Sequence, residues 1–144
     1  MSDTDDFLTE THPRMVAELQ ALHNGDPEPR LAMWSTHEPV TLFGAARNGR
    51  GWSEVSGIFR SIASRWSDCN DQRVEIVAAG VSGDLAYTVA LEHTSVSVDG
   101  VPVDPYTLRV TQVYRREGGE WKVVHRHGDP PPKDQTLPGE ASTG

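Results

Sequence analysis

The stretch from Tyr106 to Asp129, YTLRVTQVYRREGGEWKVVHRHGD, constrains the fold of this chain more than any other. Apolar and polar residues alternate on both sides of Gly118-Gly119, a pattern that predicts two long strands joined by a two-residue turn. A turn of this length also sets the register of a hairpin. The predicted cross-strand pairs are Arg116 with Trp121, Tyr114 with Val123, Gln112 with His125 and Val110 with His127.

A second hairpin is predicted immediately before it, with Asp99-Gly100 as its turn. Its register places His93 opposite Tyr106, and both hairpins then assign one large, apolar and aromatic set to one face. We expect that face to meet the helices, although a one-residue bulge near Pro102 or Pro105 would reverse part of the assignment. The inward set is Leu85, Tyr87, Val89, Leu91, His93, Tyr106, Leu108, Val110, Gln112, Tyr114, Trp121, Val123, His125 and His127.

The opposite face of the predicted sheet is small or polar. Glu92 should lie diagonal to Arg109 there, within reach of an ion pair. Such a face suits either solvent or a second subunit. Its members are Ala86, Thr88, Ala90, Glu92, Arg109, Thr111, Val113, Val124 and Arg126.

Helices are predicted before the sheet, which indicates the α+β class. Helical spacing of apolar residues runs from Phe7 to His23, and a short second helix follows Asp26-Pro27 as far as Trp34. The third helix, from Ser53 to Trp66, has the clearest amphipathic pattern in the chain. The predicted strands are 40–43, 73–79, 85–98, 106–116 and 121–127.

The 144 residues are enough for one domain with a real core, and we assign that domain to residues 7–129. Residues 1–6 are polar and acidic, and residues 130–144 begin with three consecutive prolines and contain no later apolar run. We expect both ends to be disordered tails.

The formal charge of −8 argues against a nucleic-acid or anionic-membrane partner. No apolar run reaches the roughly 18 residues that a membrane span requires. The acidic N-terminus does not resemble a secretory signal, and the single Cys69 excludes an internal disulfide. We therefore expect a cytoplasmic protein, and the sequence indicates no cofactor.

Four strings extend these arguments to a known family: GDPEPRLAMWSTHEPVTLFG, GWSEVSGIFRSIASRW, SGDLAYTVALEH and the Tyr106–Asp129 stretch. Together they resemble the SnoaL-like proteins of the nuclear-transport-factor-two and ketosteroid-isomerase superfamily. The last string is also similar to the association domain of calcium/calmodulin-dependent kinase two. The resemblance implies a cystatin-like cone, in which N-terminal helices pack on a curved antiparallel sheet. It also implies a homodimer through the outer sheet face.

The resemblance leaves the function open, because the superfamily includes isomerases, cyclases, dehydratases and assembly domains. Its catalytic carboxylate has no counterpart on the predicted inward face before Asp129, at the rim. The kinase association domain has an inward arginine where this chain has Gln112. We expect either proton transfer on a carbonyl compound bound in the cone or a non-catalytic dimerisation or assembly module.

Two histidines, His93 and His125, are the predicted catalytic bases, since imidazole in an apolar cone is poised to move a proton near neutral pH. Each has a second interpretation as a hydrogen-bonded core side chain. A small organic ligand is the expected occupant of the cone. The predicted ligand-binding residues are Trp34, Trp52, Tyr87, His93, Tyr106, Gln112, Tyr114, His125, His127 and Asp129.

A metal site is a third hypothesis for the same region. His125 and His127 alternate on one strand, so both point to one side, and Asp129 follows at the same spacing. His-x-His is common by chance, and the superfamily resemblance implies no metal. We expect none.

Overall fold

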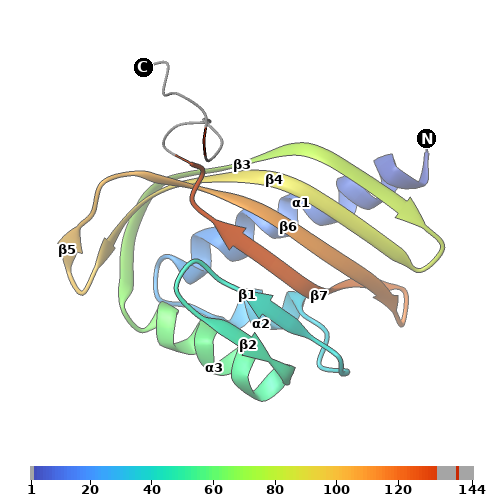
Figure 1. Ribbon diagram of the computed structural model, residues 1–144, viewed down its shortest axis with the longest axis horizontal. Helices are drawn as coiled ribbons and strands as arrows, with labels where there is room; N and C mark the ends of the chain where they lie inside the picture. Colours follow the sequence, from blue (N-terminus) through green and yellow to red (C-terminus); the bar gives the residue numbers. More distant parts are fainter. Residues whose placement is uncertain (1, 133–138, 140–144) are drawn as a thin grey trace.

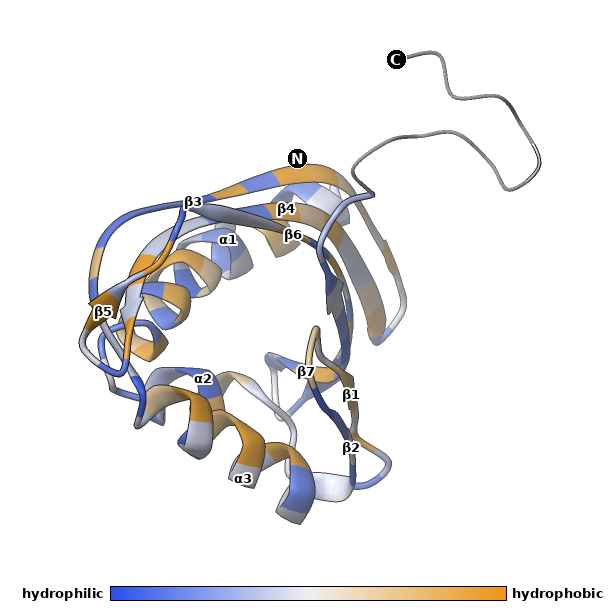
Figure 2. Cartoon of the chain, turned by 60° about the vertical axis from the view of Figure 1, so that its left-hand side comes forward, coloured by the Kyte–Doolittle hydropathy of each residue, from blue (hydrophilic) through white to orange (hydrophobic). Residues whose placement is uncertain are grey.

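Three helices pack into the hollow of one strongly curved sheet in the computed structural model, which describes residues 2–132 and 139 (Figures 1 and 2). The predicted α+β cone is confirmed. The helices are α1 (Asp3–Leu22), α2 (Glu28–Met33) and α3 (Gly51–Ala63). The strands are β1 (Thr41–Phe43), β2 (Asn48–Arg50), β3 (Trp66–Ser82), β4 (Leu85–Val98), β5 (Val101–Pro102), β6 (Tyr106–Glu117) and β7 (Glu120–Asp129).

The sheet has the strand order β2-β1-β7-β6-β4-β3, with β5 paired to β4 beside this path. It is mixed, not wholly antiparallel as predicted, because β1 runs parallel to β7. The N-terminal segment that carries β1 and β2 therefore extends the C-terminal hairpin. This addition brings the β1–β2 loop and α3 to the inward side of β7 (Figure 2).

Helix α1 begins four residues earlier than predicted. The Ser2 side chain accepts a hydrogen bond from the Asp5 backbone N–H at 3.1 Å, and the Asp5 carboxylate accepts one from the Ser2 N–H at 3.4 Å. This reciprocal capping, with Asp3 and Asp6 also in the first turn, suits the positive end of the helix dipole. The prediction of a disordered tail over residues 1–6 is therefore wrong from Ser2 onward. In the predicted C-terminal tail, residues 133–138 and 140–144 lie outside the described part.

The core lies between the helices and the inward face of the sheet. Val55, Phe59 and Ala63 of α3 are buried, as the amphipathic pattern predicted. Trp66 does not continue that helix, because α3 ends at Ala63 and Trp66 is the first residue of β3. Farther along the cone, Phe7 packs edge-on against Tyr114 and Trp121, with ring centroids 5.0 and 5.3 Å apart.

The register of β4 against β6 differs from the prediction by one residue. The turn at Asp99-Gly100 forms, and Val98 pairs with Val101 as a two-residue turn requires. The 103–105 segment then takes up one extra residue before β6 begins, so Tyr106 pairs with Thr94 instead of His93. Because side chains alternate along a strand, this slip turns every β4 side chain to the other face. The predicted inward positions of Leu85, Tyr87, Val89, Leu91 and His93 are wrong.

A second one-residue irregularity interrupts the β6–β7 hairpin. The predicted pairs of Arg116 with Trp121 and Tyr114 with Val123 are confirmed, but Val113 pairs with His125, so Val124 is an extra residue. Beyond this bulge, β7 presents the opposite set of side chains. Arg126 and Gly128 face inward, and His125 and His127 face outward.

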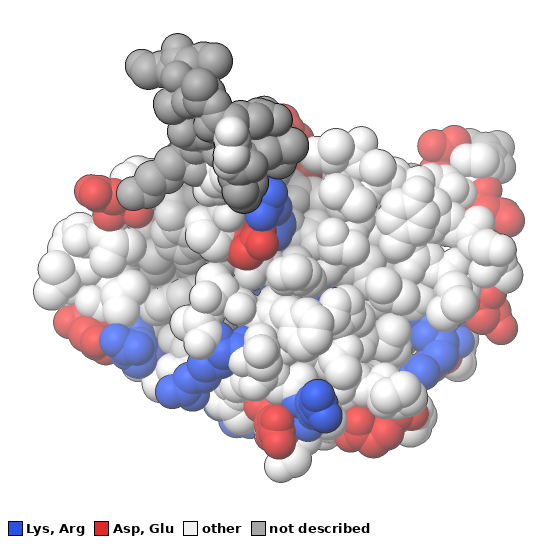
Figure 3. Space-filling model, viewed as in Figure 1, with Lys and Arg blue, Asp and Glu red and all other residues white. Residues whose placement is uncertain are grey.

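The outward face of the sheet carries exposed apolar side chains. Val77, Leu85 and Tyr87 are exposed there, with Tyr87 45% accessible. Figure 3 shows this face from outside, and few charged atoms lie over its centre.

Candidate functional site

A cavity of about 240 Å³ lies on the inward side of the sheet, at the end of the cone formed by α3 and the β1–β2 loop. Its walls are mainly apolar, because the helix faces and the inward strand positions that surround it carry aliphatic and aromatic side chains. These apolar lining residues are Leu22, Leu42, Ile58, Phe59, Ile62, Trp66 and Leu108.

Polar side chains converge on this cavity from several elements. His23 follows α1, Arg30 belongs to α2, Glu92 and Thr94 come from β4, and Tyr106 and Arg126 come from β6 and β7. All but Tyr106 are buried. The register shift between β4 and β6 brings Glu92 inward, and the bulge in β7 brings Arg126 inward. A few polar groups in an apolar concavity are typical of a binding site.

Glu92 and Arg126 form a fully buried, two-pronged ion pair. Arg126 Nη1 donates to Glu92 Oε2 and Nη2 donates to Oε1, both at 2.8 Å. Burial alone would raise the pKa of Glu92, but the charge and hydrogen bonds of Arg126 outweigh it and lower that pKa to about 2. Glu92 is therefore ionised and held by its partner, which makes it a poor general base.

A second buried ion pair, between Arg30 and Glu18, lies beside the first. Arg30 Nε donates to Glu18 Oε2 at 2.5 Å, and Nη2 donates to Oε1 at 3.2 Å. The guanidinium carbon of Arg30 also lies 5.0 Å from the centroid of the Phe59 ring. Burial raises the pKa of Glu18, and the charge of Arg30 opposes that shift. The pair fixes Arg30 against the cavity wall.

Behind the cavity, a hydrogen-bond chain supports Arg126. Gln112 Oε1 accepts from Arg126 Nη1 at 3.1 Å, and Gln112 Nε2 donates to the Tyr114 hydroxyl at 2.6 Å. That hydroxyl also contacts Thr88 Oγ1 at 3.0 Å. Gln112 and Tyr114 thus face inward as predicted, but they lie outside the cavity lining and act as supports.

His23 and Tyr106 form the neutral polar pair of the cavity. The Leu19 carbonyl lies 2.7 Å from His23 Nδ1, and because a carbonyl only accepts, the proton belongs on Nδ1. His23 Nε2 then accepts from the Tyr106 hydroxyl at 3.0 Å. The imidazole stacks on Trp66, with centroids 4.2 Å apart. Backbone and ring contacts together hold the basic nitrogen of His23 toward Tyr106.

The protonation states of this pair follow from burial. Removal from water lowers the pKa of His23 to about 4, so the imidazole is neutral at pH 7. Burial, with a smaller effect from the Glu92 charge, raises the pKa of Tyr106 to about 12. The cavity therefore presents an unprotonated imidazole nitrogen beside an intact phenol.

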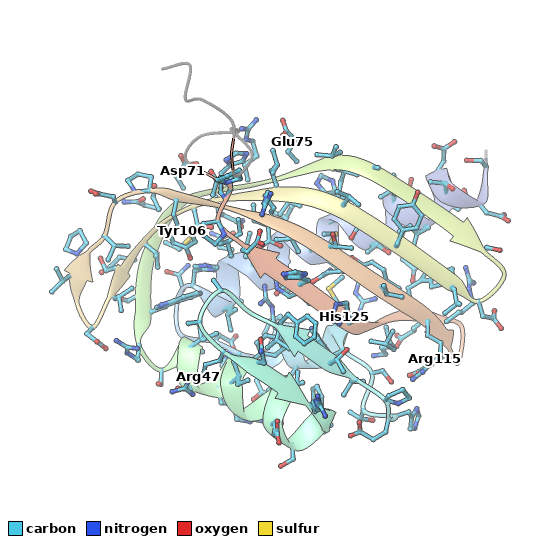
Figure 4. The ribbon with its side chains drawn as sticks, in the orientation of Figure 1. Arg47, Asp71, Glu75, Tyr106, Arg115 and His125 are labelled. Carbon is cyan, nitrogen blue, oxygen red and sulfur yellow. The ribbon has the colours of Figure 1, made fainter. Side chains whose placement is uncertain are left out.

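Two arginines line the outer part of the cavity. Arg47 belongs to the β1–β2 loop, where the Gly44 N–H donates to the Arg47 carbonyl at 2.8 Å. Arg65 follows α3 and pairs with Asp99 at 2.8 Å. Figure 4 shows Arg47 and Tyr106 at the same end of the molecule, on the β1–β2 loop and at the start of β6, respectively.

The three predicted site histidines lie on the outward face instead. His93 Nδ1 is 2.9 Å from Thr107 Oγ1, and His125 Nδ1 is 2.7 Å from Thr41 Oγ1. His127 is about half exposed and lies 3.8 Å from an Asp129 oxygen. The prediction that these histidines face into the cone is wrong, because each lies beyond a one-residue shift in pairing.

Of the other predicted ligand-binding residues, Tyr106 alone lines the cavity. Trp34 is buried against Phe59, with centroids 5.3 Å apart, and Trp52 packs against the core from the start of α3. Tyr87 is exposed on the outer face, and Asp129 pairs with Arg109 at the surface. The ion pair predicted between Glu92 and Arg109 does not form. Glu92 pairs with Arg126 instead, and Arg109 pairs with Asp129.

Sequence reasoning missed His23, Arg30, Glu92 and Arg126. Glu92 and Arg126 were assigned to the outer face by the predicted register. For His23 a usable signal existed, since it follows Leu19 by four residues and so continues the buried stripe of α1. Arg30 has no comparable signal, because a single arginine in a short helix gives no indication of burial.

His125, His127 and Asp129 do lie near one another on the outer face. Within residues 2–132 and 139, however, no group of three His, Cys, Asp or Glu side chains is arranged to hold a metal ion.

Among the described residues, none of the helices is both long enough and apolar enough to cross a bilayer.

Comparisons with known proteins support the same fold. The sequence profile of the SnoaL-like domain matches residues 14–132. A nuclear transport factor 2-like superfamily protein from Salmonella enterica serovar Typhimurium superposes with a TM-score of 0.75 at 19% identity, covering 95% of this chain and 98% of that one. A comparison with curated protein sequences finds no match.

Two further solved structures are similar at the level of fold. A candidate dehydratase of the same superfamily from Streptomyces avermitilis has a TM-score of 0.72 at 21% identity, covering 89% of this chain and 98% of that one. A candidate calcium/calmodulin-dependent protein kinase type II association domain from Thiobacillus denitrificans has a TM-score of 0.65 at 19% identity, with coverages of 83% and 93%.

Proposed function

Since this chain belongs to the SnoaL-like domain family, we propose that it binds a small organic molecule in the cone cavity and transfers a proton next to a carbonyl group there. The observation that carries the proposal is the His23–Tyr106 pair on the cavity wall. The similar candidate dehydratase belongs to a reaction class that also moves protons.

The proposed chemistry assigns one role to each member of the pair. Tyr106 turns its O–H from His23 to the carbonyl oxygen of the ligand and stabilises the negative charge that develops on it. This frees His23 Nε2 to accept the proton from the adjacent carbon. A pKa of about 4 is low for a general base, but the general base of a ketosteroid isomerase is an aspartate with a pKa of about 4.6. His23 thereby takes the role first predicted for His93 or His125.

Exchange of carbon-bound protons for deuterium tests this proposal without a known substrate. Small cyclic ketones and oxo acids are incubated with the protein in deuterated buffer, and loss of the α-proton signal is followed by NMR. We expect catalysed exchange that His23→Gln abolishes and Tyr106→Phe slows by about 100-fold, the usual cost of losing one oxyanion donor.

The outward-facing side chains provide matched controls for this experiment. His93→Gln and Tyr87→Phe make the same chemical changes on the other side of the sheet, and both should leave the exchange rate unchanged. Equal loss of exchange in the controls would contradict the assignment, as would full activity of His23→Gln.

We also propose that the chain forms a homodimer through the outward sheet face, which is an assembly function independent of catalysis. Its support is the exposed apolar side chains Val77, Leu85 and Tyr87, with a depression of about 530 Å³ whose lining includes Val77, Val89 and Leu91. Exposed apolar patches of this kind mark association surfaces.

Sedimentation velocity tests the dimer. Tyr87→Glu should shift the protein from dimer to monomer, since it buries an unpaired charge in the contact. Val101→Glu, at a more exposed apolar site on β5, should leave the dimer intact. A monomeric wild-type protein, or a Tyr87→Glu variant that stays dimeric, would refute this interface.

A further inference from the structure

Building on the proposed ligand site, we infer that the ligand is a small organic acid whose carboxylate is held by the guanidinium groups of Arg30 and Arg126. Both side chains line the cavity and are buried, with 4% and 5% of their surface exposed. The ion pairs with Glu18 and Glu92 leave one nitrogen of each guanidinium available to donate a hydrogen bond to a ligand.

Arg30 uses two of its three nitrogens on Glu18. Nε and Nη2 donate to the two carboxylate oxygens, and Nη1 has no hydrogen-bond partner within residues 2–132 and 139. This nitrogen carries two N–H groups. Glu18 holds the guanidinium in place, and because Arg30 lines the cavity, its remaining donors can serve a ligand there.

Arg126 is held in a similar way by Glu92 and Gln112, through Nη1 and Nη2. Its Nε makes no hydrogen bond to any described residue. A guanidinium N–H that is not used by a protein acceptor can donate to a ligand oxygen in the cavity. The two arginines therefore bring charged donors to the same cavity.

The charge of the whole lining also favours an anion. Of the 13 Lys and Arg residues in the chain, four line the cavity: Arg30, Arg47, Arg65 and Arg126. Of the 21 Asp and Glu residues, Glu92 is the one that the described structure places in the lining. Three of these arginines have carboxylate partners, in Glu18, Glu92 and Asp99, and Arg47 has none among the described residues, so the balance of charge around the cavity is modestly positive and favours an anion.

The ligand's remaining part must be apolar and small. Leu42, Ile58 and Leu108 supply aliphatic surface to the same cavity, and about 240 Å³ of space limits the ligand to one ring or a short chain. A neutral carbonyl compound would fit the same walls. It would not use charged donors as well as a carboxylate does, because guanidinium and carboxylate match in charge and geometry.

Matched ligand pairs test this inference on the unmodified protein. Benzoate is compared with benzamide, and cyclohexanecarboxylate with cyclohexanecarboxamide, because each pair keeps its shape and changes its charge. Binding is measured by NMR titration at constant ionic strength, with the Trp66 indole N–H and the Leu108 amide as reporters of the cavity. We expect each acid to bind at least about tenfold more tightly than its amide, a difference of about 1.4 kcal/mol.

A paired substitution then tests the role of Arg30. Glu18→Met with Arg30→Met removes a whole buried ion pair and leaves no unpaired charge, a change that folded proteins often tolerate. Its control is Arg60→Met, which removes a positive charge from an exposed ion pair with Glu28. The double variant should lose at least about tenfold in benzoate affinity, and the control should keep wild-type affinity.

The outcomes separate this inference from the proposed function. If amides bind in the cavity as tightly as acids, the acid inference is overturned and a cavity for small molecules remains. If neither series shifts the cavity reporters and no α-proton exchange is catalysed, the proposed function falls as well. Acid binding that is unchanged in the Glu18→Met, Arg30→Met variant would also overturn the assignment to Arg30.

Discussion

Arg126 lies directly opposite Gln112 on the paired strands β7 and β6, and its Nη1 donates to Gln112 Oε1 at 3.1 Å. The hairpin turn alone would place His125 there. The extra residue Val124 moves Arg126 into the cone, where it meets Glu92 from β4. The bulge at Val124 thus places the permanently charged Arg126 inside the cone, where the simple hairpin register would place the imidazole of His125. Arg126 thereby supplies an inward arginine next to Gln112.

Removing Arg126 should destabilise the fold strongly. Arg126→Met leaves the buried Glu92 without its partner, and we expect a loss of about 3 to 5 kcal/mol in the free energy of unfolding, measured with urea. Adding Glu92→Met should recover most of that loss. As a control, Arg109→Met breaks the exposed pair with Asp129 and should cost less than about 1 kcal/mol. Equal costs for the two single variants would show that Glu92 and Arg126 are not a buried pair in solution.

His23 should make the protein sensitive to mild acid. Its pKa is lowered from 6.5 to about 4 by burial, so between these values the unfolded chain binds a proton that the folded chain excludes. Stability is therefore full above pH 6.5 and falls as the pH drops toward 4, by about 3 kcal/mol from this group. The charges of Arg30, Glu92 and Arg126 also act on His23, but burial has the largest effect on its pKa.

Urea unfolding at a series of pH values checks this slope. His23→Gln should flatten the curve between pH 6.5 and 4, whereas His127→Gln, at an exposed site, should retain it. A wild-type protein whose stability does not change over this range would contradict a buried neutral His23.

Loss of the hydroxyl should destabilise the protein at Tyr114 and have little effect at Tyr87. Tyr114→Phe removes a buried partner from both Gln112 and Thr88, so we expect a loss of about 1 to 3 kcal/mol. Tyr87→Phe changes an exposed side chain and should be nearly neutral. Thermal and urea unfolding of both variants measures the difference. Similar losses at both sites would mean that the two residues share a face, as the simple hairpin register predicted.

The outward histidines should be dispensable for binding in the cone. His93→Gln and His125→Gln alter side chains that hydrogen-bond to Thr107 and Thr41 on the far side of the sheet. We expect benzoate affinity within about twofold of wild type in both variants. NMR titration of the Trp66 indole N–H provides the measurement, and a tenfold loss in either variant would show that the histidine reaches the cavity.

Much of the architecture follows from the sequence by itself. The helical period predicted three helices, and alternation predicted the long strands, because local spacing determines which faces can be buried. The Gly118-Gly119 turn correctly predicted the pairing of Tyr114 with Val123 near the turn. Gln112 and Tyr114 face inward for the same reason.

The site itself was decided by tertiary structure. One extra residue at 103–105 and another at Val124 reverse the faces of β4 and of the end of β7. The local spacing of apolar residues does not reveal these extra residues, because a strand with a bulge can have the same alternating sequence as a strand without one. The sequence therefore determined the cone and its helices, whereas tertiary packing determined which side chains of β4 and β7 face the interior of the cone. Burial of Glu92 with Arg126, in place of His93 with His125, follows from that packing.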